Sequence, residues 1–487
     1  MRIPKIFLKL KNSWLWKHRV IVLSISPFAL AGVIGLGIYA WQLHVRKNIL
    51  AEVDATYHTM KVDWTAQGES IGVRPYLSGP VPPHQNYHEH PAFLAELNDK
   101  HSPTLMQLDY DGIVGMSADI DYESSDYSHG TSADLQRWLD PQASGISQKQ
   151  AAERCLKLYA PINQRLDALK QATLRPQVST VDPIANYDAM TDAHMVSRRT
   201  GSILARRAIL FLASQQPQQA LSDVTALHRI LKHSEKMPCL LGLVCHAGIL
   251  VSYQDAVSYG LLTNKWTEAE LHVIAQQLDA IDLPQHLHKS LRAEAGFMFG
   301  EIQKLLAQKE VIQKSDFSLR LPKKWDMAGL ETYYEKQKKS CAPDAFNVMA
   351  HLEEVDFLIK HVIYADGPST STITPKTIRA LFASPRSTYK ITLTPLVIFQ
   401  ISQQNLHAAV AVSRYRLHHG TAPKSLGDLI PAYLPKVPHG AISGKDLHYH
   451  IKPDGTAVIY SEGQDQHNDG GDPDLDDCFQ LPMLLPR

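Results

Sequence analysis

An uncharged apolar run from Val20 to Leu43 is the feature that most restricts how this 487-residue chain can fold. As a helix it is long enough to cross about 30 Å of hydrocarbon, the thickness of a bilayer core. Six basic residues and no acidic residue precede Leu43, and basic flanks stay on the cytoplasmic side of a membrane. The sequence therefore predicts a protein of the cell inner membrane, crossing the lipid bilayer once through residues 20–43. Its N-terminus is expected in the cytoplasm, and the bulk of the chain in the periplasm.

The alternative for the same segment is a cleaved signal peptide. The apolar run is longer than the usual hydrophobic region of such peptides, and residues 38–40 match the small-residue cleavage pattern poorly, so an uncleaved anchor is favoured. Export permits disulfides, but five cysteines leave at least one thiol outside any pairing within the chain. Cys239 and Cys245 are six residues apart in a helical stretch, so they face different sides and are predicted to be buried apolar residues.

The composition predicts a folded chain of two or three units. Hydrophobic residues make up 44% of the sequence and charged residues 20%, which is ordinary for globular proteins. The 49 basic and 49 acidic residues balance overall, but with six basic residues lying before Leu43 the remainder is mildly acidic. A nucleic-acid-binding protein would need a basic face, and the sequence offers none.

The predicted fold class is mainly α: an N-terminal transmembrane helix, an all-α helical-hairpin body, and a small α+β C-terminal module with a long helix and a short antiparallel sheet. Apolar residues recur at helical spacing in the body, and Pro217, Pro284 and a capping box at Thr267 mark helix starts. The predicted helices span 147–173, 190–214, 217–235, 237–262, 267–281, 284–314, 343–363 and 395–419. Two strands are expected near 447–451 and 456–461, joined by a turn.

Proline-rich and Ser/Thr-rich stretches suggest where the units are divided. Residues 73–91 contain too many prolines for a helix or central strand and are predicted to be extended, and residues 366–375 resemble a linker. The predicted units are a cytoplasmic basic head (1–19), the anchor (20–43), a helix and proline-rich connector region (44–146), the all-α body (147–365), a connector (366–394) and the C-terminal module (395–487).

No nucleophile elbow, P-loop, zinc-protease helix or dinucleotide fingerprint is present in workable form. The 24 histidines offer apparent metal clusters, yet His84, His88 and His90 in the proline-rich stretch are more simply explained as part of a solvated connector. His246 is predicted to be a hydrogen-bonded core histidine. The basic residues at 198, 199, 206 and 207 could hold an anion, and ordinary salt bridges with neighbouring helices are the favoured explanation.

The acidic stretch from Tyr460 to Asp477 matches a coordination template. Counted from Asp465, acids fall at positions 1, 5 and 12 with glycine at position 6, close to the calcium loop of helix–loop–helix proteins. His467 takes position 3, where calcium prefers oxygen, and an acidic solvated turn explains the composition about as well. The predicted metal ligands for Ca²⁺ are Asp465, Asp469, Asp472, Asp474 and Asp476.

The C-terminal region resembles the periplasmic domain of the major pseudopilins of type II secretion. The resemblance rests on Arg414-Tyr415-Arg416, Gly420, Pro423, Leu434-Pro435 and the pattern Tyr460-Ser461-x-Gly463-x-Asp465. It implies a long helix leading to a small sheet, and a calcium site that uses Asp465, acids near Asp476 and backbone carbonyls. Most of the chain also resembles a set of single-pass exported proteins of planctomycete and verrucomicrobial bacteria, through residues 81–86, the helical body and the stretch 467–472. That second resemblance implies topology and module order only.

The sequence thus predicts a membrane-anchored extracytoplasmic protein that binds an unidentified protein partner, with a calcium-stabilised C-terminal module and no nucleic acid. The chain is not expected to be an enzyme. One alternative is an exported hydrolase with its site in the helical body, for which His246, Asp255, Glu294 and Glu301 are candidates. The other is an accessory component of a type II secretion-like system.

Overall fold

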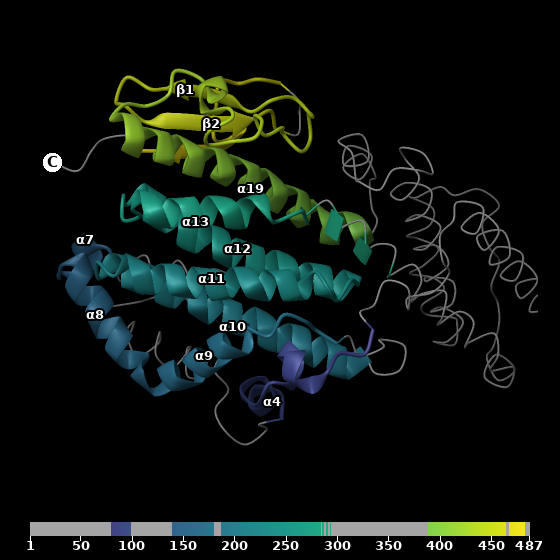
Figure 1. Ribbon diagram of the computed structural model, residues 1–487. Helices are drawn as coiled ribbons and strands as arrows, with labels where there is room; N and C mark the ends of the chain where they lie inside the picture. Colours follow the sequence, from purple (N-terminus) through teal and green to yellow (C-terminus); the bar gives the residue numbers. More distant parts are fainter. Residues whose placement is uncertain are drawn as a thin grey trace, which may run out of the picture. The chain divides into compact units, whose positions relative to one another are not determined.

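The computed structural model describes residues 79–98, 139–179, 187–283, 285–286, 289–290, 293, 388–463 and 467–482 (Figure 1). The predicted anchor at 20–43 and the predicted helix at 343–363 lie outside these ranges. Among the helices that the structure does describe, none combines the length and the apolar character needed to cross a bilayer. The described residues are mainly helical with one small antiparallel sheet, as the sequence predicts.

The described helices of the body from α10 to α13 agree with the predicted segments to within a few residues, and most of the predicted helix at 284–314 lies outside the described residues. Pro217 and Thr267 are used as predicted, the first in the opening turn of its helix and the second as an N-cap whose capping box includes Glu270. One predicted helix is divided, because the segment 147–173 breaks at Tyr159 and restarts with Pro161 in its first turn. The helices are α4 (Pro91–Asn98), α7 (Pro141–Ser144), α8 (Gln148–Leu158), α9 (Ala160–Ala172), α10 (Tyr187–Ala213), α11 (Pro217–Ser234), α12 (Leu240–Leu262) and α13 (Glu268–Asp279).

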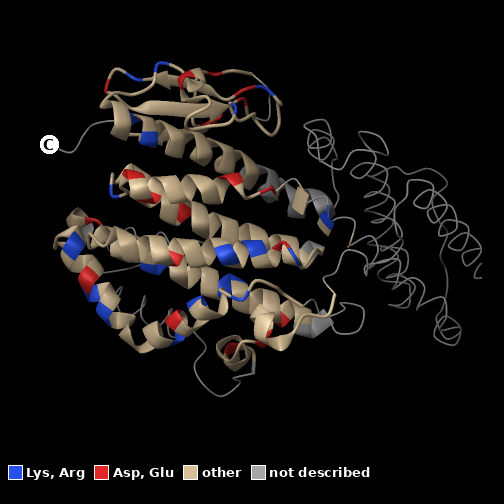
Figure 2. Cartoon of the chain, viewed as in Figure 1, with Lys and Arg blue, Asp and Glu red and all other residues tan. Residues whose placement is uncertain are grey.

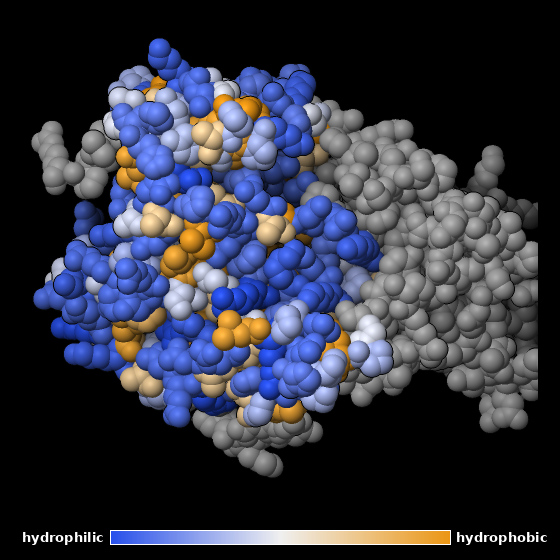
Figure 3. All heavy atoms as spheres, in the orientation of Figure 1, coloured by the Kyte–Doolittle hydropathy of each residue, from blue (hydrophilic) through white to orange (hydrophobic). Residues whose placement is uncertain are grey.

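The core of the body lies between α10, α11 and α12, which contact one another along their lengths. Leu204, Leu227 and Leu250 are completely buried there, one from each helix. Each fully buried aliphatic side chain stabilises the folded state by about 1.5–3 kcal/mol through removal from water. Because these apolar side chains are inside, the face shown in Figure 3 is mostly hydrophilic, with hydrophobic residues scattered over it. Figure 2 shows Lys and Arg interspersed with Asp and Glu along the helices of the body.

The proline-rich stretch before α4 differs from its prediction. It forms two short 3-10 helices, η2 (Pro83–Gln85) and η3 (Tyr87–Glu89), and not an extended solvated connector. Tyr87 is fully buried, stacking on His233 with ring centroids 4.7 Å apart, and its backbone N–H donates to Gln177 O at 2.8 Å. Tertiary packing of this aromatic side chain therefore overrides the extended preference of the prolines around it.

The C-terminal part contains a long helix, α19 (Thr388–His419), and a three-stranded sheet. The helix begins before Pro395, which was predicted as its start. The strands β1 (His448–Ile451), β2 (Ala457–Ser461) and β3 (Asp477–Leu481) are antiparallel in the order β1-β2-β3, with Ser461 opposite Asp477. The sequence predicts the first two strands and misses β3, so the acidic stretch is a loop between two strands.

The helix α19 joins the sheet to the helical body. It contacts β2 and β3 on one side and α12 and α13 on the other (Figure 1). The Arg414 guanidinium donates to Glu268 of α13 at 3.1 Å, and Gln254 of α12 donates to the carbonyl of Phe399 at 3.0 Å. Both described parts therefore belong to one compact unit.

Candidate functional site

The acidic loop, residues 467–476 as described, packs against the sheet. The backbone of Gly471 lies against Val458 and Tyr460, two residues that point to the same face of β2. The Tyr460 hydroxyl donates to Asn468 Oδ1 at 3.1 Å, and the same oxygen accepts from the N–H of Gly470 at 3.0 Å. The sheet therefore fixes the position of the loop from its first described residues onward.

Asp476 holds the loop in place through its buried side chain. Its side chain is only 4% exposed, and Oδ2 accepts from the backbone N–H of Asp469 at 3.0 Å and of Gly471 at 2.8 Å. Its other oxygen, Oδ1, is buried and has no hydrogen-bond partner in the described part of the chain. A buried carboxylate oxygen without a proton donor is costly unless a cation compensates it.

The other predicted ligands are more exposed. Asp469, Asp472 and Asp474 all lie at the surface, and Asp472 Oδ1 accepts from the N–H of Asp474 at 3.0 Å. Asp465 lies outside the described residues. The structure links Asp469 to Asp476 through the backbone, and the described ranges contain no group of three His, Cys, Asp or Glu side chains with the geometry of a metal site.

The donor set nevertheless suits a hard cation. Carboxylates predominate, and hard divalent ions such as Ca²⁺ prefer oxygen. Burial and the charge of Asp476 raise the pKa of Asp477, which shows that negative charge is concentrated at this end of β3. Glu462, missed by the count that started at Asp465, is 4% exposed and accepts from Lys445 at 2.8 Å through Oε1, while its Oε2 is buried with no hydrogen-bond partner among the residues that the structure describes. Glu462 directly follows the predicted strand that became β2, and this position in the sequence could have indicated it as a candidate ligand.

Two adjacent glycines give the loop its turn. Gly470 and Gly471 have φ of +76° and +81°, a left-handed conformation that costs other residues about 1–2 kcal/mol. A Cβ at Gly470 would meet nothing within 4 Å, whereas one at Gly471 would lie 2.8 Å from Val458 Cγ1.

We expect Gly471→Ala to lower the free energy of unfolding by about 2–4 kcal/mol, since crowding adds to the backbone strain. Gly470→Ala is the matched control and should cost only about 1–2 kcal/mol, for the strain alone. Urea unfolding of the two variants and the parent protein measures both. Equal losses in the two variants would mean that the loop is not held against β2.

A second polar group is buried inside the helical body. His246 Nδ1 lies 2.7 Å from Ser234 Oγ, which donates to the Leu231 carbonyl, so the imidazole is hydrogen-bonded in the core as predicted. Its ring lies 4.4 Å from that of His286. Burial, reinforced by the charge of Lys232, lowers the pKa of His246 to about 3. Other buried histidines, with ring nitrogens that have no partner among the described residues, are His88, His194, His233 and His286.

The residues considered for a hydrolase are not brought together. His246 and Asp255 both lie on α12, nine residues apart, which places them on opposite sides of that helix. Burial raises the pKa of Asp255 to about 6, yet the pair shares no contact. Glu294 and Glu301 lie outside the described residues.

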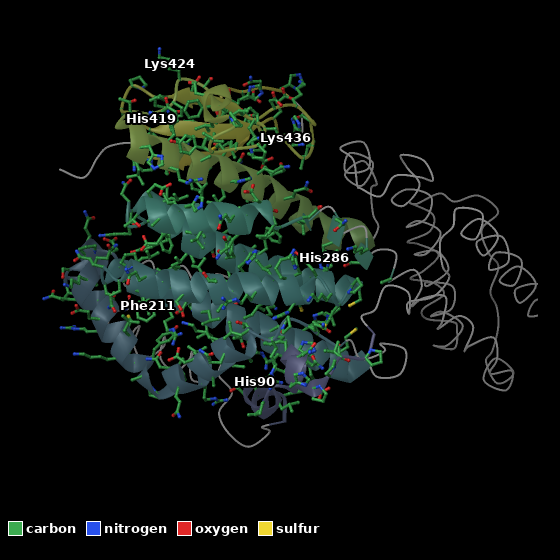
Figure 4. The ribbon with its side chains drawn as sticks, in the orientation of Figure 1. His90, Phe211, His286, His419, Lys424 and Lys436 are labelled. Carbon is green, nitrogen blue, oxygen red and sulfur yellow. The ribbon has the colours of Figure 1, made fainter. Side chains whose placement is uncertain are left out.

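The predicted basic stripe of α10 contains a buried ionic network. Arg207 is 2% exposed and forms a bidentate ion pair with Asp223 of α11. Its Nε donates to Oδ2 at 2.7 Å, and its Nη2 donates to Oδ1 at 2.8 Å. Lys170 of α9 lies 2.6 Å from the same carboxylate. The Arg207 guanidinium also stands over the Phe211 ring, 5.7 Å from its centroid. In Figure 4, Phe211 lies towards one end of the stacked helices and His286 towards the other, so the Arg207 guanidinium over Phe211 is separate from the pair of His246 and His286.

In the C-terminal part the long helix α19 comes first, and the acidic loop connects strands β2 and β3 of the small sheet. The loop concentrates carboxylates at the surface, whereas His246 lies inside the helical body with a pKa lowered by burial. Comparison of the chain with models of protein families, with curated proteins and with solved structures finds no match.

Proposed function

We propose that the protein is a membrane-anchored, extracytoplasmic, non-enzymatic protein whose helical body binds a protein partner and whose C-terminal loop binds Ca²⁺. The observation that supports the calcium proposal is the buried Oδ1 of Asp476, which has no hydrogen-bond partner in the described part of the chain. The membrane proposal rests on the apolar run 20–43 and its basic flank.

In this proposal Asp476 holds the ion through Oδ1, while Asp465, Asp469, Asp472 and Asp474 supply further carboxylate oxygens. Bound calcium would neutralise the repulsion among these acids. The protein's own contribution is to fix the loop: Asp476 Oδ2 holds two backbone N–H groups, and Tyr460 positions Asn468. Calcium would thereby tighten the connection between β2 and β3.

The partner-binding part of the proposal is supported by the hydrogen-bonded junction between the helical body and the C-terminal part. Arg414 bonds Glu268 and also His272 Nδ1 at 2.9 Å, and it stands over the Tyr433 ring at 5.4 Å. A fixed junction presents both parts to a partner as one surface. Crosslinking in the native membrane would identify that partner, and a component of a secretion machine would support the type II secretion alternative.

Calcium should raise the melting temperature of the full-length protein in detergent relative to the same sample in EDTA. A ligand at a hundred times its Kd stabilises the folded state by about 2.7 kcal/mol. The double variant Asp472→Asn/Asp474→Asn keeps the bond from the N–H of residue 474 to the side-chain oxygen of residue 472 but removes two charges, so it should bind calcium at least tenfold more weakly in calorimetry.

Asp454→Asn is the matched control. Asp454 lies in the exposed β1–β2 turn and accepts from the Thr456 N–H at 2.8 Å, a bond that asparagine also makes. It should leave calcium binding unchanged. No calorimetric heat, together with equal melting in calcium and EDTA, would remove the calcium part of the proposal.

A further inference from the structure

Three side chains with metal-ligating atoms, two sulfurs and one imidazole nitrogen, meet where α10 passes the start of α12. Cys239 Sγ lies 3.9 Å from Met190 Sδ and 3.8 Å from His194 Nε2. All three residues are buried, with exposed fractions of 4%, 2% and 0% for Cys239, Met190 and His194. This group contains only one cysteine and one histidine, and its third donor is a thioether sulfur.

The local structure holds the three atoms together. Met190 and His194 are four residues apart on α10, so their side chains share one face of the helix. Cys239 is the N-cap of α12, and its sulfur accepts from the Gly242 N–H at 3.1 Å. A Cβ at Gly242 would lie 2.9 Å from His194 Nε2, so the absence of a side chain there leaves room for the imidazole beside the cysteine.

The two separations from Cys239 Sγ match those of ligands around a three-coordinate ion. With metal–sulfur bonds of about 2.3 Å and metal–nitrogen bonds of about 2.0 Å, a planar trigonal ion separates two sulfurs by about 4.0 Å and sulfur from nitrogen by about 3.7 Å. The observed separations, 3.9 Å and 3.8 Å, need almost no adjustment.

We propose that Met190, His194 and Cys239 form a binding site for a soft monovalent metal ion, Cu(I). Thiolate and thioether ligands select Cu(I), and imidazole also suits copper. Binding releases the thiol proton to solvent and forms the copper–thiolate bond, with no change in the oxidation state of copper or sulfur. The resulting unit of Cu⁺ and one thiolate is neutral, which suits a buried apolar place, whereas Zn²⁺ would leave a net positive charge there.

The helix start favours the deprotonated cysteine that the ion requires. A thiolate at a helix N-terminus is stabilised by the N–H groups and the dipole of the helix, here those of α12. Without the metal, the same distances correspond to weak hydrogen bonds from the thiol to the thioether or the imidazole. The experiment has to separate these two roles.

The reduced full-length protein should be titrated anaerobically with Cu(I) in competition with bicinchoninate. We expect one tightly bound Cu(I) per chain, lost at least a hundredfold in affinity in Cys239→Ser and at least tenfold in Met190→Leu, which preserves volume. Cys155→Ser and Cys245→Ser, buried cysteines elsewhere in the body, are matched controls and should bind as the parent does.

X-ray absorption gives a second readout that does not depend on affinity. The parent should show two sulfurs and one nitrogen around copper, and Met190→Leu should show one sulfur fewer. Circular dichroism melting checks that each variant is folded. Equal Cu(I) affinity in the parent, Cys239→Ser and Met190→Leu, or a copper shell without sulfur, would overturn the proposal and leave the thiol as a hydrogen-bond donor only.

Discussion

Lowering the pH from 7 to 5 is expected to reduce the free energy of unfolding by several kcal/mol. Burial lowers the pKa of His228 and of His233 to about 4, and of His88 and of His246 to about 3. Positive charges nearby add to the effect, Lys232 beside His246 and Lys236 beside His233. Burial also lowers the pKa of His286 well below its ordinary 6.5.

The sign follows from which state takes up protons. Above pH 6.5 these histidines are neutral in both states and contribute no pH dependence. As the pH falls below 6.5, the unfolded chain binds protons that the folded protein excludes, so stability is lost until the pH reaches the folded pKa values near 3–4. Each such histidine lowers stability by about 1.4 kcal/mol per pH unit in that window.

Urea unfolding at several pH values measures the slope. In His246→Asn the amide can replace Nδ1 as the partner of Ser234, so the loss of stability per pH unit should shrink by about 1.4 kcal/mol. His84→Gln is the control, since His84 is exposed, and it should keep the parent slope. A flat profile between pH 7 and 5 would show that the histidines take up protons in the folded state.

Asp223→Asn should lower the free energy of unfolding by about 3–5 kcal/mol, the usual cost of removing one partner from a buried ion pair. The Asp223 side chain is fully buried and neutralises both Arg207 and Lys170. Asparagine keeps the shape but leaves two cations, side chains 3% and 17% exposed, without their shared counter-charge. The loss is measured by urea unfolding at pH 7.

Asp167→Asn is the control, because Asp167 contacts the same Arg207 at 3.0 Å but its side chain is 63% exposed. Water screens such a pair, so the expected loss is below about 1 kcal/mol. Comparable losses in the two variants would mean that Arg207 depends on its solvent-facing partner as much as on its buried one.

Helix positions in the body could be predicted from the sequence because their signals are local. Pro217 and the Thr267 capping box act within one helical turn. The apolar residues around Val224 and Leu227 recur at helical spacing within a single segment, so no distant partner is needed to recognise them. The hairpin of β1 and β2 was predictable for the same reason. The hydrogen-bonded core position of His246 followed from its apolar neighbours in sequence.

Features that depend on distant partners were not predictable in this way. β3 is a strand because it pairs with β2 across the acidic loop, and its short sequence carries no clear strand pattern. Tyr87 is buried because His233 lies beneath it, although prolines surround it in sequence. At the candidate site, the spacing identified Asp476 but could not show that one of its oxygens binds the loop backbone while the other has no partner among the described residues.

The position of β3 in the sequence also has a consequence for how the sheet is made. β2 is the central strand, and its second neighbour, Asp477–Leu481, is the last described strand to leave the ribosome. Until those residues arrive, the N–H and C=O groups on one edge of β2 are open to pairing with another chain. A product truncated within the acidic loop would keep that edge permanently, so premature termination here should yield an aggregating protein instead of a shortened functional one.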